Sequence, residues 1–167
     1  MVKFTNILVP TDFSDNSVHA FEFAHYIAMP SKAILHVLHI VEPAITDGAI
    51  KNLFNKEKFE HSKLLEAEEE LRRFINKISP QGIKIVEALE HGKPYEQILN
   101  YSTKNHIDLI VIASHGWTGL SHLITGNVAN KVMRYSEVPI ICIKTTSSIL
   151  QKYNSINESS FAENWFG

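Results

Sequence analysis

The sequence predicts an α/β fold, a doubly wound, five-stranded parallel sheet with helices on both faces. Short apolar runs alternate along the chain with longer stretches whose apolar residues recur at helical spacing. Residues 107–113 (IDLIVIA) are almost wholly apolar, which is typical of a strand buried on both faces of a parallel sheet. Crossovers between such strands are right-handed, and they distribute the helices over both faces.

The first half of the chain is predicted to form two strands and two helices. Residues 4–10 (FTNILVP) and 33–41 (AILHVLHIV) are apolar runs of strand length. Between them, apolar residues recur every three or four positions over 15–28, and the Ser-Asp pair at 14–15 is suited to cap that helix. Residues 50–78 combine one apolar face with many charges, which predicts a long helix with a solvated outer side.

The second half is predicted to continue the alternation. Residues 83–89 are a further apolar run, and 94–103 form a helix whose first residue, Pro94, suits the first turn. The strand at 107–113 follows. A helix at about 127–135 and a last strand at 138–143 complete the five-stranded pattern.

Composition fits one globular domain. The 167 residues are 44% hydrophobic and 20% charged, enough apolar material for a substantial core, and the net charge of −2 provides no basic field for nucleic acid or an anionic membrane. No apolar stretch approaches the roughly 20 residues of a membrane span, and the first strand begins too early to follow a signal peptide. We therefore expect a soluble, cytoplasmic protein. Cys142 is the single cysteine, which excludes an internal disulfide and predicts a buried, inert thiol.

A loop punctuated by Gly116, Gly119 and Gly126 leads from the strand at 107–113 into the helix at 127–135. Such a loop presents backbone N–H groups and a positive helix end to one point, where anions bind. The glycines could instead serve only the turn and the packing of helix on strand. The sequence leaves both interpretations open.

Polar residues also follow the first two strands, in VPTDFS at 9–14 and HIVE at 39–42. In open α/β sheets, ligands bind outside the carboxyl ends of the strands where the strand order reverses. If the first and fourth strands are neighbours there, Asp12 and the glycine loop face one crevice. The Asp12 carboxylate could then accept hydrogen bonds from a ribose hydroxyl or an exocyclic amine, or it could cap the following helix.

These segments together resemble the universal stress protein family. The resemblance rests on four segments over roughly residues 1–145: 9–14 (VPTDFS), 38–43 (LHIVEP), 91–99 (HGKPYEQIL) and 113–144 (ASHGWTGLSHLITGNVANKVMRYSEVPIICIK). It implies a Rossmann-like domain of five parallel strands, usually a homodimer, and one branch of the family binds ATP.

The ATP-binding branch has the pattern Gly, two residues, Gly, nine residues, Gly, then Ser or Thr. This chain has Ala113, Gly116, Gly126 and Asn127 at those positions, so two of the four depart from the pattern. Ala113 adds one methyl group to a strand residue that needs no positive φ, and we expect it to be tolerated. Asn127 remains a favoured N-cap with a donor that can reach a phosphate oxygen, although it is longer than serine.

The resemblance implies an ATP or AMP site, which Mg²⁺ could accompany. Ribose and adenine would be held by Pro10, Thr11, Asp12 and the backbone near Ile40. Ala113 stands where the family glycine allows close approach of the ribose. The phosphates would be held by Ser114, His115, Gly116, Gly126, Asn127 and Val128.

Other chemistries have weaker support. The only Gly-Lys pair, at 92–93, precedes a proline and is no P-loop. His36 and His39 are three apart on a strand and should point to opposite faces, which disfavours a metal site there. His115 and His122 could converge on the glycine loop, although His115 is more simply a donor to phosphate. We expect neither a metal site nor catalytic residues.

The sequence thus predicts a dimeric adenine-nucleotide-binding regulator or sensor of the stress response. One alternative is a nucleotide-free dimerisation and protein-interaction module, and another is a slow ATPase or autokinase, for which no base or activated nucleophile is visible. The homodimer is expected through the strand at 138–143, with Pro139 limiting the ladder. The domain should span 1–145, and the tail at 146–167 ends in aromatic residues that could dock or fray.

Overall fold

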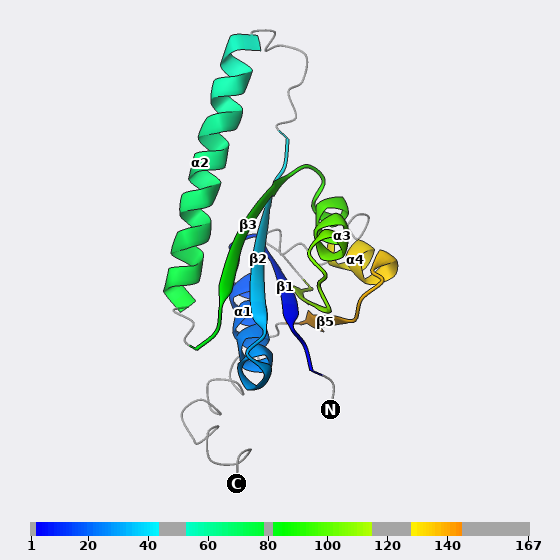
Figure 1. Ribbon diagram of the computed structural model, residues 1–167. Helices are drawn as coiled ribbons and strands as arrows, with labels where there is room; N and C mark the ends of the chain where they lie inside the picture. Colours follow the sequence, from blue (N-terminus) through cyan, green and yellow to red (C-terminus); the bar gives the residue numbers. More distant parts are fainter. Residues whose placement is uncertain (1–2, 44–52, 79–81, 115–127, 145–167) are drawn as a thin grey trace.

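The computed structural model describes residues 3–43, 53–78, 82–114 and 128–144. Its centre is a single parallel sheet in the order β3-β2-β1-β4-β5 (Figure 1). The strands are β1 (Asn6–Thr11), β2 (Ile34–Val41), β3 (Ile85–His91), β4 (Leu109–Ala113) and β5 (Ile140–Ile143). The chain builds outward from β1 to β3, then crosses to β4 on the other side of β1 and continues to β5. This is the predicted doubly wound sheet.

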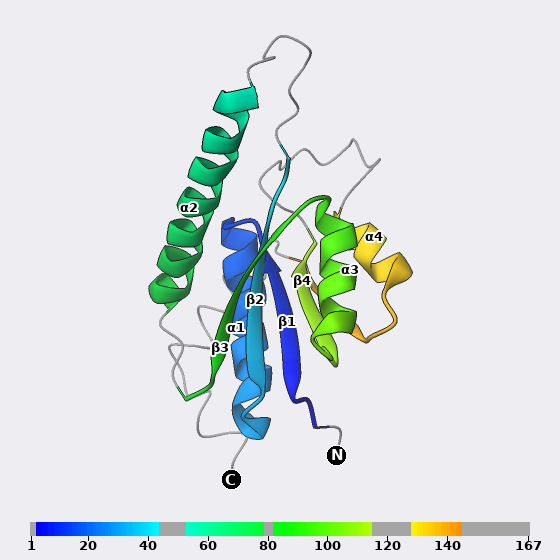
Figure 2. The same ribbon diagram turned by 45° about the horizontal axis from the view of Figure 1, so that its top comes forward.

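Helices cover both faces of the sheet (Figures 1 and 2). The first face carries α1 (Asp15–Ala28) and α2 (Leu53–Ile78), and the second carries α3 (Pro94–Lys104) and α4 (Val128–Tyr135). A short 3-10 turn, Met29–Ser31, follows α1. The helices and strands agree with the predicted order, and their ends differ from the predicted ones by a few residues.

The core consists of two hydrophobic clusters, one on each face, because successive side chains of a strand point to opposite sides. On β1, Ile7 and Val9 pack with α1 and α2, while Leu8 packs with α3 and α4. All three are fully buried. The continuous apolar strands of the sequence therefore reflect burial on both faces.

The edge strand β5 corrects the prediction for Cys142. Every residue of β5 is only partly buried, because within the described sheet this strand pairs with β4 alone. Cys142 is accordingly half-buried and not enclosed in the core. The burial that remains raises the pKa of its thiol. The predicted domain boundary at 145 and the aromatic tail at 146–167 lie outside the described residues.

Candidate functional site

The carboxyl ends of β1 and β4 meet where the strand order reverses. These two strands are neighbours, with Ile7 opposite Leu109 and Leu8 opposite Ile110. β1 extends from there to Thr11 and β4 to Ala113. Because β1 and β4 are neighbours, the condition set in the sequence analysis is met, and the strand ends that lead into VPTDFS and into the glycine loop lie at the position where open α/β sheets bind ligands.

Pro10 explains why the sheet opens at this position. The backbone of β1 alternates between its neighbours, since the Thr5 carbonyl accepts from Ile34 on the β2 side and the Asn6 carbonyl accepts from Asp108 on the β4 side. Pro10 shares the orientation of Asn6, so it faces β4. A proline has no N–H to donate, and the β1–β4 pairing ends two residues earlier, at Leu8. We use the name β1–β4 seam for the strand ends beyond the last β1–β4 pair, which are residues 9–11 of β1 and 111–113 of β4.

The Asp12 side chain is held by the first turn of α1. Its Oδ1 accepts hydrogen bonds from the Ser14 backbone N–H at 3.1 Å, from the Ser14 hydroxyl at 2.6 Å and from the Ser17 hydroxyl. Ser14 is the N-cap of α1, and its Oγ accepts from the Ser17 N–H. Asp12 therefore supports the helix cap, which was the alternative interpretation of this residue. It is also exposed, so a fixed carboxylate is accessible to solvent beside the β1–β4 seam.

Two residues that the sequence analysis did not assign to the site shape the turn after β1. Phe13 adopts a left-handed φ of 65°, which is uncommon for a bulky side chain. Its ring stacks on His39 with centroids 4.2 Å apart and lies 5.9 Å from that of Phe74 on α2. The feature that could have indicated the role of His39 is strand register, because His39 on β2 is paired with Thr11 at the end of β1.

His39 links the ends of these two strands. Its Nδ1 donates to the Thr11 carbonyl over 2.9 Å. Burial lowers the pKa of His39, and this effect is opposed by the Thr11 carbonyl and by the carboxylates of Glu70, Asp12 and Glu42. The imidazole thus fixes the backbone immediately before Asp12.

The remaining predicted site residues fall into two groups. Pro10, Thr11 and Ile40 are buried at the ends of β1 and β2, whereas Ala113 and Ser114 are half-buried at the end of β4. The Ser114 N–H donates to the Ile143 carbonyl over 2.9 Å, which ties the end of β4 to the end of β5. Val128 begins α4 and packs against the second core cluster. The phosphate-side candidates in the glycine loop lie outside the described residues: His115, Gly116, Gly126 and Asn127.

His36 faces away from this site, as its spacing from His39 predicted. It is buried on the α3 side, where Nδ1 lies 3.0 Å from the Tyr101 hydroxyl and Nε2 lies 3.3 Å from Asn6 Oδ1. Within the described ranges, no group of three His, Cys, Asp or Glu side chains could hold a metal ion. The helices of those same ranges include none with the length and apolar character needed to cross a membrane.

Comparison with known proteins decides the family. The sequence model of the universal stress protein family matches residues 3–144. The chain belongs to this family. Universal stress protein YxiE of Bacillus subtilis is 28% identical over 153 residues, an alignment that covers 84% of this chain and 99% of YxiE.

Solved universal stress proteins share the fold. The structure of UspA from Lactobacillus plantarum superposes with a TM-score of 0.73 at 23% identity, covering 86% of this chain and 99% of that one. A universal stress protein in complex with cAMP gives a TM-score of 0.65 at 22% identity, with 87% and 100% coverage. The Archaeoglobus fulgidus protein in complex with dAMP gives 0.60 at 23% identity, with 86% and 100% coverage.

Proposed function

We propose that this universal stress protein binds an adenine nucleotide, ATP or AMP, across the β1–β4 seam and acts as a regulator or sensor in the stress response. The observation that carries the proposal is the Asp12 carboxylate, which is exposed at the seam while three donors hold its Oδ1 in place. Two relatives of the same fold were crystallised with the adenine nucleotides cAMP and dAMP, and this supports the ligand class.

The residues around Asp12 suit the nucleoside half of such a ligand. A fixed carboxylate accepts hydrogen bonds from ribose hydroxyls or an adenine amine without the entropic cost of ordering its side chain on binding. On its β1 side, the backbone of β4 has no register partner beyond Ile110, although β4 stays paired with β5 on its other side. Ile40 is a buried apolar residue near the end of β2. Recognition of the base and sugar therefore falls to Pro10, Thr11, Asp12 and the backbone at Ile40.

The phosphate half falls on the end of β4 and on the glycine loop. The Ser114 hydroxyl, the loop from His115 to Asn127 and the start of α4 at Val128 supply donors and a positive helix end for an anion. If ATP is the ligand, Mg²⁺ would be bound mainly through its phosphates. We propose binding rather than turnover, since recognition by these groups needs neither a base nor a nucleophile.

We include a homodimer through β5 in the proposal. β5 is a short apolar edge strand with a half-buried row of Ile140, Ile141, Cys142 and Ile143, and a second copy could cover this row. Pro139 lies just before the strand, so its missing N–H is outside the row. Light scattering at tens of micromolar protein should give the mass of two chains, and a monomer would contradict this part of the proposal.

Asp12→Asn tests the nucleotide site directly. The substitution keeps the size of the side chain and removes the charge and one acceptor, so we expect AMP and ATP to bind about tenfold more weakly, equal to about 1.4 kcal/mol. Isothermal calorimetry with each nucleotide, with and without Mg²⁺, measures the change and also orders ATP against AMP. The matched control is Asp15→Asn, because the Asp15 side chain is 94% exposed three residues along and makes only a 4.0 Å contact with Lys77.

Ser17→Ala tests whether nucleotide affinity depends on how the Asp12 carboxylate is held, and not only on its charge. The variant retains Asp12 and removes one of its three donors, so we expect affinity to fall by roughly threefold, within the usual value of one hydrogen bond.

If neither nucleotide produces heat or a shift in melting temperature at millimolar concentration, the nucleotide proposal is wrong. The interaction-module alternative then becomes the better account of the domain.

A further inference from the structure

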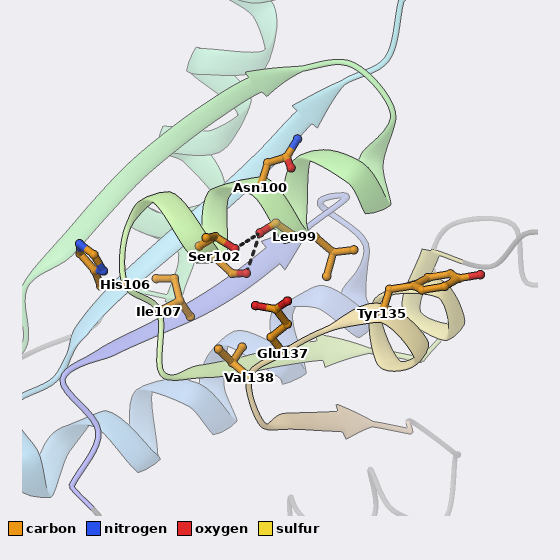
Figure 3. A pocket seen from close by; sticks show the side chains of 9 residues that line it. Leu99, Asn100, Ser102, His106, Ile107, Tyr135, Glu137 and Val138 are labelled. Carbon is orange, nitrogen blue, oxygen red and sulfur yellow. Dashed lines mark hydrogen bonds between the residues drawn. The ribbon is translucent and has the colours of Figure 1, made fainter.

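A cavity of about 330 Å³ lies near the amino ends of β4 and β5, whereas the proposed nucleotide site lies at the carboxyl ends of the strands. It is open to solvent on one side, and it is lined by the last turns of α3, the segment that leads into β4, the last residue of α4 and the connection from α4 to β5 (Figure 3). Its size is near the lower limit of small-molecule pockets, which suits a ligand about as large as an amino-acid side chain. The nucleotide proposal makes no use of it.

The α3 wall of this cavity presents hydrogen-bond acceptors. The hydroxyls of Ser102 and Thr103 both donate to the Leu99 carbonyl, over 2.8 Å and 3.2 Å. A hydroxyl has only one hydrogen to donate, so both oxygens are left with acceptor lone pairs for any further partner. Ser102 is itself buried, with only 6% of its surface exposed.

One carboxylate, that of Glu137, lines the cavity, while the Arg134 guanidinium lies at the Tyr135 ring on its rim. Glu137 projects from the α4–β5 connection toward Leu99 and Ser102, as Figure 3 shows. None of the nine described residues that line the cavity is lysine or arginine. The carboxyl ends of α3 and α4 also meet here, and the carbonyl end of a helix carries a partial negative charge.

The floor of the cavity is apolar. Leu99 and Val138 are half-buried, and Ile107 is buried beneath them. The Tyr135 ring lies at the rim, where the guanidinium of Arg134 is 5.7 Å from its centre. An apolar floor beneath acceptors and one carboxylate complements a ligand with a cationic N–H group on a short alkyl chain.

We propose that this cavity binds a small organic cation of the amine or guanidine class. The cationic group donates to the Glu137 carboxylate and to the Ser102 and Thr103 oxygens, while its alkyl chain lies on Leu99 and Val138. Glu137 is exposed, so its contribution is that of a solvent-screened ion pair, and affinity is in the millimolar range. The same head group occurs on free metabolites and on arginine side chains. We assign the cavity to the free compounds because its volume of about 330 Å³ suits a group of side-chain size without flanking peptide groups.

Titration of the full-length protein with n-butylguanidinium tests the assignment. Amide chemical shifts of residues 99–107 and 135–138 should change saturably, and n-butylurea, which has a similar shape without the charge, should bind at least fivefold more weakly. Glu137→Gln should weaken n-butylguanidinium by roughly threefold to tenfold, in line with the loss of an exposed ion pair. Glu66→Gln, which changes an exposed carboxylate on α2, is the matched control and should leave binding unchanged.

Three results would overturn the proposal. They are the absence of saturable shifts at tens of millimolar n-butylguanidinium, equal binding of n-butylurea, and an unchanged affinity in Glu137→Gln. A further arm uses acetylarginine methylamide, which carries the flanking peptide groups of a protein chain. If it binds more tightly than n-butylguanidinium, the natural ligand is a basic side chain of a partner and the assignment to free compounds is wrong.

Discussion

His36 and His39 lie three residues apart on β2, yet their surroundings differ in kind. On the α3 side, the ring of His36 is enclosed by side chains and both nitrogens have partners, Tyr101 and Asn6. Asn6 Oδ1 can only accept, so Nε2 donates to it and Nδ1 accepts from the tyrosine hydroxyl. On the α2 side, the half-buried ring of His39 bonds to the backbone of Thr11 and stacks on Phe13.

The difference separates two uses of the same residue type. A histidine whose partners are buried side chains completes the core, since loss of the ring leaves several polar groups unpaired. A histidine bonded to a carbonyl at the end of a strand sets the path of the next turn. Here that turn carries Asp12, so His39 affects the site through backbone geometry, and His36 affects it only through the stability of the whole domain.

The same substitution at both positions tests this distinction, and His36→Phe should have the larger effect. It removes two hydrogen bonds and leaves the Tyr101 hydroxyl and the Asn6 amide oxygen without their partner, so we expect a loss of about 2–4 kcal/mol in the free energy of unfolding. Urea unfolding measures it. Nucleotide affinity of the folded fraction should not change, and a loss of affinity without a loss of stability would contradict the structural role.

His39→Phe should have a smaller effect on stability and a larger one on binding. The new ring can still stack on Phe13, while the donor to the Thr11 carbonyl is lost, and we expect about 0.5–1.5 kcal/mol of destabilisation. Because the turn before Asp12 loosens, the proposed nucleotide affinity should fall by roughly threefold. Calorimetry with AMP on the two phenylalanine variants gives the comparison directly, and equal affinities would remove the positioning role of His39.

The smallest effect is a graded dependence of stability on pH. Burial lowers the pKa of both histidines below the ordinary value of 6.5, with Lys84 adding to the effect at His36. The unfolded chain therefore binds protons first, so this contribution to stability is complete above pH 6.5 and declines as the pH falls below it. The free energy of unfolding should decrease from about pH 7.5 to about pH 5.5, and His36→Phe should flatten the curve. An unchanged slope in that variant would show that His36 is not responsible.

The sequence predicted the fold because periodicity decides it. Residues such as Ile7 and Leu8 alternate between two buried faces, and the apolar runs of β1, β2 and β4 are long enough to identify. Strand ends were less accurate, since β5 begins at Ile140 and not at Val138. The Val138 N–H bonds to the Ser136 hydroxyl instead of joining the ladder, a local contact that hydrophobic patterning does not reveal.

The candidate site was predicted less completely. The position of Asp12 follows from its place after a strand, but its three donors depend on how α1 begins. Phe13 escaped notice because a left-handed φ is expected at glycine or asparagine and not at phenylalanine. The half-buried state of Cys142 depends on which strand lies at the edge, and the order of strands in a sheet is not written in the periodicity of any one strand.

The proline in β1 also determines where the domain is weakest. The two parts of the sheet, β3-β2-β1 and β4-β5, share two register pairs, at Ile7 and Leu8, and none from Pro10 onward, whereas β1 and β2 share six. Local opening of the sheet should therefore begin with the separation of β1 from β4 at the carboxyl end of β1 and proceed toward Leu8, because few register pairs hold these two strands together. A ligand that contacts both β1 and β4 would oppose their separation. Ligand binding would then also reduce local opening at the edge strand β5, without any change of fold.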